Sequence, residues 1–155
     1  MHNPLKMNDS NHLKILFVDD DSDEMYLFKE ALEHTGLNIS LSNAQNGNQL
    51  KEYLFNKTLP DLVFLDINMP YKDGLESLIE IRSNPLLDKL KIIIYSTTKV
   101  KNIVHACFNA GADLFVLKPD DFDGMVKVIG SVCKRNWNAF ERPLINDGFV
   151  IKYDE

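Results

Sequence analysis

Short apolar runs and longer amphipathic stretches alternate five times along the chain. Four of the apolar runs are nearly continuous in Ile, Val, Leu and Phe, which is typical of parallel strands buried on both faces. The other run alternates polar and apolar residues, which indicates an edge strand. In chain order, the predicted strands are Lys14–Asp19, Asn38–Ser42 (the edge strand), Asp61–Asp66, Lys91–Tyr95 and Leu114–Leu117.

The stretches between these runs repeat apolar residues at the spacing of a helix that is buried on one side. The predicted helices are Ser22–Thr35, Gly47–Asn56, Leu75–Arg82, Val100–Asn109 and Phe122–Trp137. Gly36 and Gly111 follow two of them, and glycine is the usual residue just past a helix end. Strands that alternate with helices through short connections specify a doubly wound α/β fold, a five-stranded parallel sheet with helices on both faces.

Candidate chemistry lies where the predicted strands end, because ligands of such sheets bind at the carboxyl ends of the strands. Those ends carry Asp19-Asp20-Asp21, Asp66, Ser96 and Lys118. Converging carboxylates repel one another unless a cation neutralises them, and an oxygen-only ligand set favours Mg²⁺. A hydroxyl and an ammonium could stabilise a phosphoryl group while a carboxylate attacks it. The set indicates phosphoryl transfer to or from an aspartate.

Composition and charge narrow the class of protein. The chain has 155 residues, enough for one domain, and a net charge of −6 argues against direct binding to nucleic acid or to anionic membranes. No run approaches the roughly 18 apolar residues of a membrane span, and the polar N-terminus does not resemble a secretory signal, so we expect a cytoplasmic protein. Cys107 and Cys133 are expected to be buried and reduced, and the four histidines lack ligand spacing.

The strand ends and the loops after them also carry a family resemblance. FVDDD at 17–21, FLDINMPYKDG at 64–74, YST at 95–97 and LFVLKP at 114–119 stand in the order and spacing of response-regulator receiver domains. The chain resembles this family from about Leu13 to about Arg135. The resemblance implies the flavodoxin-like strand order 2-1-3-4-5. It divides the chain into a polar segment at 1–12, a receiver domain at 13–136 and an extension at 137–155.

The resemblance also implies a phosphoacceptor and a metal site. Asp66 would accept a phosphoryl group from the phosphohistidine of a sensor histidine kinase or of a histidine phosphotransfer protein. Asp20 would bind Mg²⁺ directly, Asp19 largely through a bound water, and Asn68 through its backbone carbonyl. Asp66 would complete this metal site.

Three further roles follow from the same resemblance. Lys118 would pair with Asp66 and then with the phosphoryl group, and its bond to Pro119 is expected to be cis. Ser96 would shift to hydrogen-bond a phosphoryl oxygen. Phe115 would rotate inward, which would make the face of the fourth helix, fifth strand and fifth helix the output surface. Phe115 stands where tyrosine is commoner, and without the hydroxyl the switch would rest on packing alone. Ser96 stands where threonine is commoner, and the missing methyl would loosen its rotamer preference.

The segment 137–155 is too short for a DNA-binding or enzymatic output domain. We therefore expect a single-domain response regulator that acts on a downstream protein target, and that catalyses only its own phosphorylation and slow autodephosphorylation. Pro143 and Asn146-Asp147-Gly148 indicate turns between apolar residues. A hairpin, a strap on the domain and a partner-binding tail all fit this pattern. We expect the segment to pack on its own domain or on a second copy, which would make a homodimer.

Other interpretations remain open from the residues. Asp21 fits a helix cap or a solvated acid better than a ligand. Asp19-Asp20-Asp21 also contains the Asp-x-Asp of haloacid-dehalogenase-type phosphatases, with Asp19 as nucleophile, but Asp23 departs from that motif and no cap domain fits. That phosphatase would leave Asp66 unexplained. A receiver-like interaction module that never takes phosphate is the third alternative, against which the full set of acids, hydroxyl and lysine argues.

Overall fold

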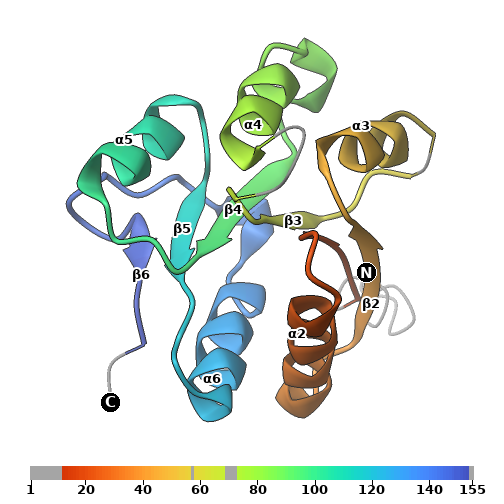
Figure 1. Ribbon diagram of the computed structural model, residues 1–155, viewed down its shortest axis with the longest axis vertical. Coiled ribbons are helices and arrows are strands. Elements are labelled where there is room, and N and C mark those ends of the chain that lie inside the picture. The colour runs from red at the N-terminus through yellow and green to blue at the C-terminus, as the bar shows by residue number, and fades with distance from the viewer. Residues whose placement is uncertain (1–11, 57, 69–72, 154–155) are drawn as a thin grey trace, which may run out of the picture.

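The computed structural model describes residues 12–56, 58–68 and 73–153. They form a six-stranded, all-parallel sheet in the order β2-β1-β3-β4-β5-β6, with helices on both of its faces (Figure 1). The elements in chain order are β1 (Leu13–Val18), α2 (Ser22–Thr35), β2 (Ile39–Ala44), α3 (Gly47–Asn56), β3 (Leu62–Leu65), α4 (Gly74–Arg82), the 3₁₀ turn η1 (Pro85–Leu87), β4 (Lys91–Ser96), α5 (Lys101–Asn109), β5 (Leu114–Leu117), α6 (Phe122–Cys133), the 3₁₀ turn η2 (Trp137–Ala139) and β6 (Val150–Ile151).

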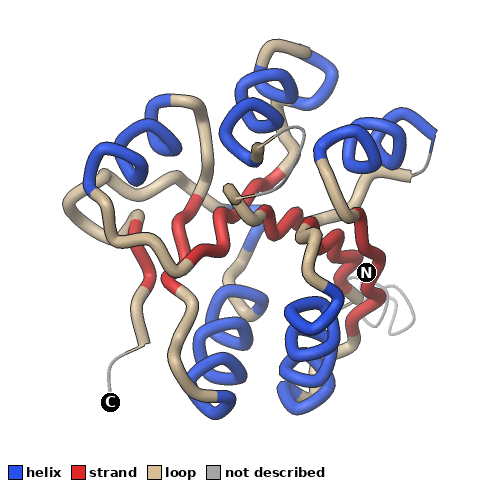
Figure 2. The backbone as a smooth tube through the Cα atoms, viewed as in Figure 1, coloured by secondary structure: helices blue, strands red, loops and turns tan. Residues whose placement is uncertain are grey.

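The two layers of helices follow from the alternation of side chains along the central strands. Leu16 and Val18 of β1 face one layer, formed by α3, α4 and α5. Ile15 and Phe17 face the other layer, formed by α2 and α6. Because both faces of each central strand are covered, these strands are almost wholly apolar, as the sequence pattern predicts. Figure 2 shows α2 and α6 side by side below the sheet and the other helices above it.

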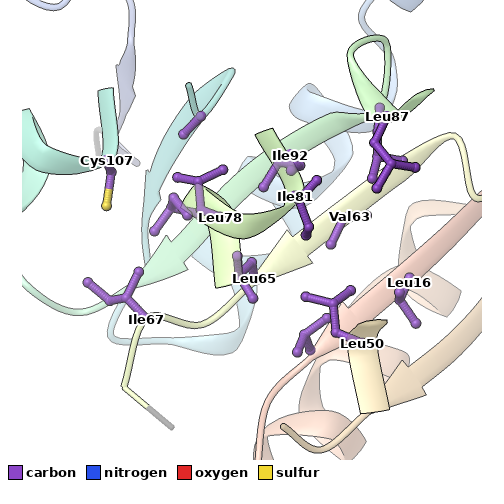
Figure 3. Packing of buried hydrophobic residues seen from close by; sticks show 14 of the residues in the cluster. Leu16, Leu50, Val63, Leu65, Ile67, Leu78, Ile81, Leu87, Ile92 and Cys107 are labelled. Atoms are coloured by element: carbon purple, nitrogen blue, oxygen red, sulfur yellow. The ribbon is translucent and has the colours of Figure 1, made fainter. Parts of the chain in front are cut away.

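The layer of α3, α4 and α5 is closed mainly by aliphatic side chains. Leu50 of α3 and Leu78 of α4 pack over β1 and β3, and Cys107 of α5 lies further along the same layer (Figure 3). Cys107 and Cys133 are both buried free thiols, as predicted. Among the described residues, no helix is long and apolar enough to cross a membrane.

The layer of α2 and α6 contains an aromatic cluster directly beneath the ends of β1, β3 and β4. Phe17 stacks on Phe28 at 4.2 Å between ring centroids, and Phe64 and Tyr95 meet Phe28 edge-on. Such contacts add to the burial of the rings themselves. The cluster gives the strand ends a rigid support, because all four side chains are completely buried.

The helix ends show which local signals the chain uses. Asp21 caps α2 by accepting a hydrogen bond from the Asp23 amide, as its structural interpretation predicts, and Gly36 ends the helix with φ 73°. The predicted end of the last helix at Trp137 is wrong, since α6 ends at Cys133. The Trp137 indole instead donates to the Val132 carbonyl at 3.0 Å, a carbonyl in the last turn of α6 that also accepts from the Arg135 amide. The other predicted ends lie within two residues of the observed ones.

The prediction of five strands is short by one, because the C-terminal segment adds β6 to the edge of β5. We call residues 137–153 the C-terminal strap. Phe115 and Val116 of β5 pair in parallel with Val150 and Ile151 of the strap. Phe149 is completely buried and meets Phe108 edge-on at 5.0 Å. The expectation that this segment packs on its own domain is therefore confirmed.

A single arginine fixes the middle of the strap to the end of α5. The Arg142 guanidinium lies 3.8 Å from the centroid of the Phe108 ring. The same group donates to the carbonyls of Phe108, in the last turn of α5, and of Ala112, in the connection to β5. Beyond it, the turn predicted around Gly148 forms, with φ 103° at that residue. These contacts direct the chain back to β5.

Candidate functional site

The strand order brings the predicted acids together. Val18 of β1 is in register with Leu65 of β3, so Asp19 and Asp66, the next residues, leave the sheet side by side. The Asp66 amide donates to the Val18 carbonyl at 2.9 Å, which continues the ladder to the site. Carboxylate oxygens of Asp19, Asp20 and Asp66 all lie within 4.8 Å of one another. The tertiary structure thus joins residues that are 46 and 47 positions apart in the chain.

Burial makes this acidic cluster electrostatically costly. Asp66 is only 7% exposed and Asp19 only 3%. Burial, and then the neighbouring Asp19 charge, raise the pKa of Asp66 to about 6, although the Lys118 charge and the Asn68 amide act to lower it. Burial also raises the pKa of Asp19, against the hydrogen bond from the Asp21 amide and the charge of Lys118. The Lys118 charge therefore offsets only part of the cost of keeping these buried carboxylates ionised.

The donor set of the cluster fits a hard divalent cation. Asp19, Asp20 and Asp66 supply carboxylate oxygens only, the ligands that Mg²⁺ and Mn²⁺ prefer. Asn68 lies against them, since its amide donates to Asp66 Oδ1 at 3.3 Å. A cation bound here would oppose the burial and the Asp19 charge, which together raise the pKa of Asp66. The structure therefore brings together the three carboxylates that the sequence predicts for a metal site, while the predicted role of the Asn68 carbonyl stays a prediction.

Lys118 enters the site from the end of β5. Its Nζ lies 3.5 Å from Asp19 Oδ2 and 3.6 Å from Glu24 Oε2, and 5.2 Å from the centroid of the Tyr95 ring. These two acids are its ion-pair partners in the part of the chain described here, and its effect on Asp66 is the longer-range lowering of the pKa. Glu24 was not identified from the sequence, where it is one more acid in the first turn of a helix.

The bond between Lys118 and Pro119 differs from the expectation. The described residues contain no cis peptide bond, so the prediction of a cis proline at this position is wrong. The trans form is the lower-energy state of bonds that precede proline by about 0.5–1 kcal/mol.

Ser96 and Phe115 occupy the strands that complete the site. Ser96 is 1% exposed, and its hydroxyl accepts a hydrogen bond from the Thr98 amide at 3.1 Å. Its carbonyl accepts from the Lys118 amide, which links the ends of β4 and β5. Phe115 is completely buried, and its amide donates to the Phe149 carbonyl at 3.0 Å. The residue expected to act as the switch therefore lies under the C-terminal strap.

Gly74 is a residue of the site that the sequence marked only as part of a turn. A Cβ at this position would lie 2.2 Å from the Asp66 carbonyl oxygen and 2.6 Å from the Ile67 Cα. Its amide donates to the Ile67 carbonyl at 3.1 Å. Glycine is required because the first turn of α4 rests directly on the backbone that carries Asp66.

A groove of about 780 Å³ opens beside Lys118, between α5, the loop after β5 and the strap. Its lining includes Lys99, Lys101 and His105 on one side and Lys152 on the other. Val104, Leu117, Ile145 and Val150 supply apolar surface. Two acids, Asp120 and Asp121, also line the groove, so its lysines give it a net positive charge beside these apolar contacts.

Comparisons with known proteins agree with this geometry. The model of the response regulator receiver domain family matches residues 15–130. The chemotaxis protein CheY of Bacillus subtilis is 33% identical over 116 residues, which span 75% of this chain and 93% of that protein. The phosphorylated cyanobacterial phytochrome response regulator RcpA has a similar structure, with a TM-score of 0.74 and 25% identity over 83% of this chain and 95% of its own. The Mn²⁺-bound form of response regulator Rcp1 has the same fold, with a TM-score of 0.73 and 24% identity over 85% of this chain and 99% of its own.

Proposed function

The chain belongs to the response regulator receiver domain family, and from this membership we propose that it is a phosphorylation switch whose phosphoacceptor is Asp66. The observation that carries the proposal is the cluster of Asp19, Asp20 and Asp66 at adjacent strand ends, with Lys118 at its side. Asp66 is the member of this cluster at the end of the central strand, between the other acids on β1 and the hydroxyl of Ser96 on β4.

The proposed reaction is transfer from a phosphohistidine. An Asp66 carboxylate oxygen attacks phosphorus, an acyl phosphate O–P bond forms, and the P–N bond breaks with its electrons going to the imidazole. With a pKa of about 6, Asp66 is mostly ionised at neutral pH and available as the nucleophile. Lys118 and Ser96 then neutralise and hydrogen-bond the phosphoryl oxygens.

A divalent cation fits the site, and we propose Mg²⁺ for this role. Asp19, Asp20 and Asp66 would hold it with the Asn68 carbonyl, and it would supply positive charge to the phosphoryl oxygens. The Mn²⁺-bound form of Rcp1, which shares this fold, supports the choice of a hard divalent cation. The haloacid-dehalogenase-type alternative would make Asp19 the nucleophile, but Asp19 is already engaged by Lys118 and by the Asp21 amide.

The proposal implies two kinds of protein partner. A sensor histidine kinase or a histidine phosphotransfer protein would supply the phosphoryl group to Asp66. The sequence predicts the face of α5, β5 and α6 as the output surface, but the strap covers the edge of β5 on that face. A downstream target would therefore bind at the groove beside Lys118, between α5, the loop after β5 and the strap. We also propose that residues 13–136 are the receiver domain and that the extension from residue 137, as far as it is described, is joined to it as the strap.

Incubation with acetyl phosphate and Mg²⁺, followed by intact-mass measurement, tests the proposal. We expect one phosphoryl group per chain, lost in Asp66→Asn and retained in Asp88→Asn, a matched change at an exposed acid far from the cluster. Labelling that depends on Asp19 instead, with steady turnover of a phosphomonoester, would establish the phosphatase. Absence of labelling in the folded wild type would leave the interaction module.

A further inference from the structure

We propose that Glu24 is a positioning residue, which holds the Lys118 ammonium beside Asp19 in the unphosphorylated protein and so opposes its movement to a phosphoryl group on Asp66. This inference rests on the proposed function and concerns its regulation. Its basis is the juxtaposition of Glu24 Oε2, Asp19 Oδ2 and the Tyr95 ring around one ammonium.

The Glu24 side chain can reach Lys118 because Asp19, and not Glu24, accepts the hydrogen bond from the N-cap amide of α2. Asp21 is the N-cap of α2, which places Glu24 at the third helical position. A glutamate at that position commonly turns back to accept a hydrogen bond from the N-cap amide. Here the Asp21 amide donates to Asp19 Oδ1 at 3.0 Å instead. The Glu24 side chain extends to Lys118, and α2 is thereby tied to the end of β5.

The Lys118 ammonium lies in a largely buried, negatively charged environment. The side chain is 12% exposed, with Asp19 at 2% and Glu24 at 32% on its two sides. The Tyr95 ring closes the third side and attracts the cation with its face. The Glu24 charge also reaches the two other groups around the ammonium. After burial, which is the larger cause, it helps to raise the pKa of Asp19 and of Tyr95. Lys118 therefore has a defined resting position.

Movement of the ammonium to a phosphoryl group must end its contact with Glu24. In the phosphorylated protein, Asp19 and Asp20 would bind the cation. Lys118 would then be attracted to the negative charge of the phosphoryl group on Asp66. The carboxylate of Glu24 then competes with the phosphoryl group for the Lys118 ammonium. Because Glu24 is one-third exposed, solvent screens the pair, and its effect is a tuning of the equilibrium and not a block.

Beryllofluoride, a phosphoryl analogue, measures this competition at equilibrium. With Mg²⁺ present, Glu24→Gln is expected to bind it about threefold more tightly than the wild type and to be labelled about threefold faster by acetyl phosphate, the size of effect typical of a partly exposed ion pair. Glu33→Gln is the matched control, because it removes the same charge from an exposed position on the same helix. Equal affinities of Glu24→Gln and the wild type would overturn the inference.

A double-mutant cycle with Lys118→Met separates positioning from general charge repulsion. If Glu24 acts through Lys118, Glu24→Gln changes nothing in the Lys118→Met background. If the effect persists there, the Glu24 charge repels the anion directly and the positioning role is wrong.

The position of the Lys118 side chain can be measured directly, by a signal that does not depend on the stability of the fold. The end of the Lys118 side chain lies over the Tyr95 ring, so its terminal methylene protons should be shifted upfield in NMR spectra. We expect Glu24→Gln to reduce this shift and Tyr95→Phe, which keeps the ring, to preserve it. An unchanged shift in Glu24→Gln would contradict the inference. If the wild type is not labelled on Asp66 at all, the proposed function fails; if it is labelled and Glu24→Gln matches it, only the inference fails.

Discussion

Asp66 is held in the folded protein against its own electrostatic preference. Its carboxylate is buried beside Asp19, and the one nearby ammonium, in the described chain, is paired with Asp19 and Glu24. The proposed cation site would need this excess of negative charge before the cation arrives. Function at this residue therefore costs stability in the empty protein.

The pH dependence of stability should show this cost. The pKa of Asp66 is raised from 3.8 to about 6, so its protonated form favours the folded state below pH 3.8 and that advantage is lost as the pH rises through 6. Without divalent cations, Asp66→Asn should raise the free energy of unfolding by about 3 kcal/mol at pH 7.5 and hardly change it at pH 3.5. Urea denaturation at both pH values is the measurement. A gain of the same size at both would show that charge is not its cause.

At the scale of elements, β6 turns the edge strand of the expected sheet into an internal one. An exposed β5 would present unpaired amides and carbonyls to solvent. The strap covers them, buries Phe149 and is fixed by Arg142 at the end of α5. Phe115, the expected switch, shares a buried cluster with Phe149. A rotation of the Phe115 side chain would therefore disturb the packing of the strap, because Phe115 contacts the strap and not solvent.

Truncation of the buried strap residue tests this packing. Phe149→Ala should lower the free energy of unfolding by about 3–4 kcal/mol, since it removes a fully buried ring from the core. It should also speed hydrogen exchange at the Phe115 amide, whose acceptor is the Phe149 carbonyl. Phe55→Ala is the control, because that ring is 58% exposed and its loss should cost little. Fast exchange at Phe115 in the wild type would contradict the pairing of β5 with β6.

At the scale of the whole molecule, the site is where the two layers and three strands meet. β1, β3 and β5 deliver Asp19, Asp66 and Lys118, while α2 delivers Glu24. A ligand bound there contacts elements from both halves of the chain. It should therefore stabilise the fold as a unit, because the unfolded chain has no such site.

Addition of Mg²⁺ tests this coupling by thermal unfolding. At a concentration about 100 times its dissociation constant, Mg²⁺ should raise the free energy of unfolding by about 2.7 kcal/mol, with a matching rise in Tm. Asp20→Asn should abolish the rise, because it removes one of the carboxylates that would bind Mg²⁺. Asp20 is the exposed member of the cluster, so this change leaves the core intact. Asp21→Asn, next to it, should keep the rise. A Tm that does not respond to Mg²⁺ in the wild type would contradict the metal site.

Much of the fold could be predicted because its signals are local. A strand buried on both faces must be apolar throughout, and an amphipathic helix must repeat every three to four residues, so the runs at Leu62–Leu65 and Lys101–Asn109 could be identified without a partner in view. The same logic placed Asp19, Asp66, Ser96 and Lys118 at strand ends. The end of α6 was misplaced because Trp137 keeps the helical spacing while the backbone has already left the helix.

The sequence by itself determined the alternation of strands and helices, the family, and the edge of the sheet where the acids would gather, since each depends on the character of neighbouring residues. Only the tertiary structure decided that Val150–Ile151 joins β5, that the first turn of α4 needs a glycine against Asp66, and that Glu24 shares Lys118 with Asp19. These are contacts between distant segments. A two-residue strand has no periodicity to read, and an acid at a helix start looks like a cap until the opposite ammonium is in place.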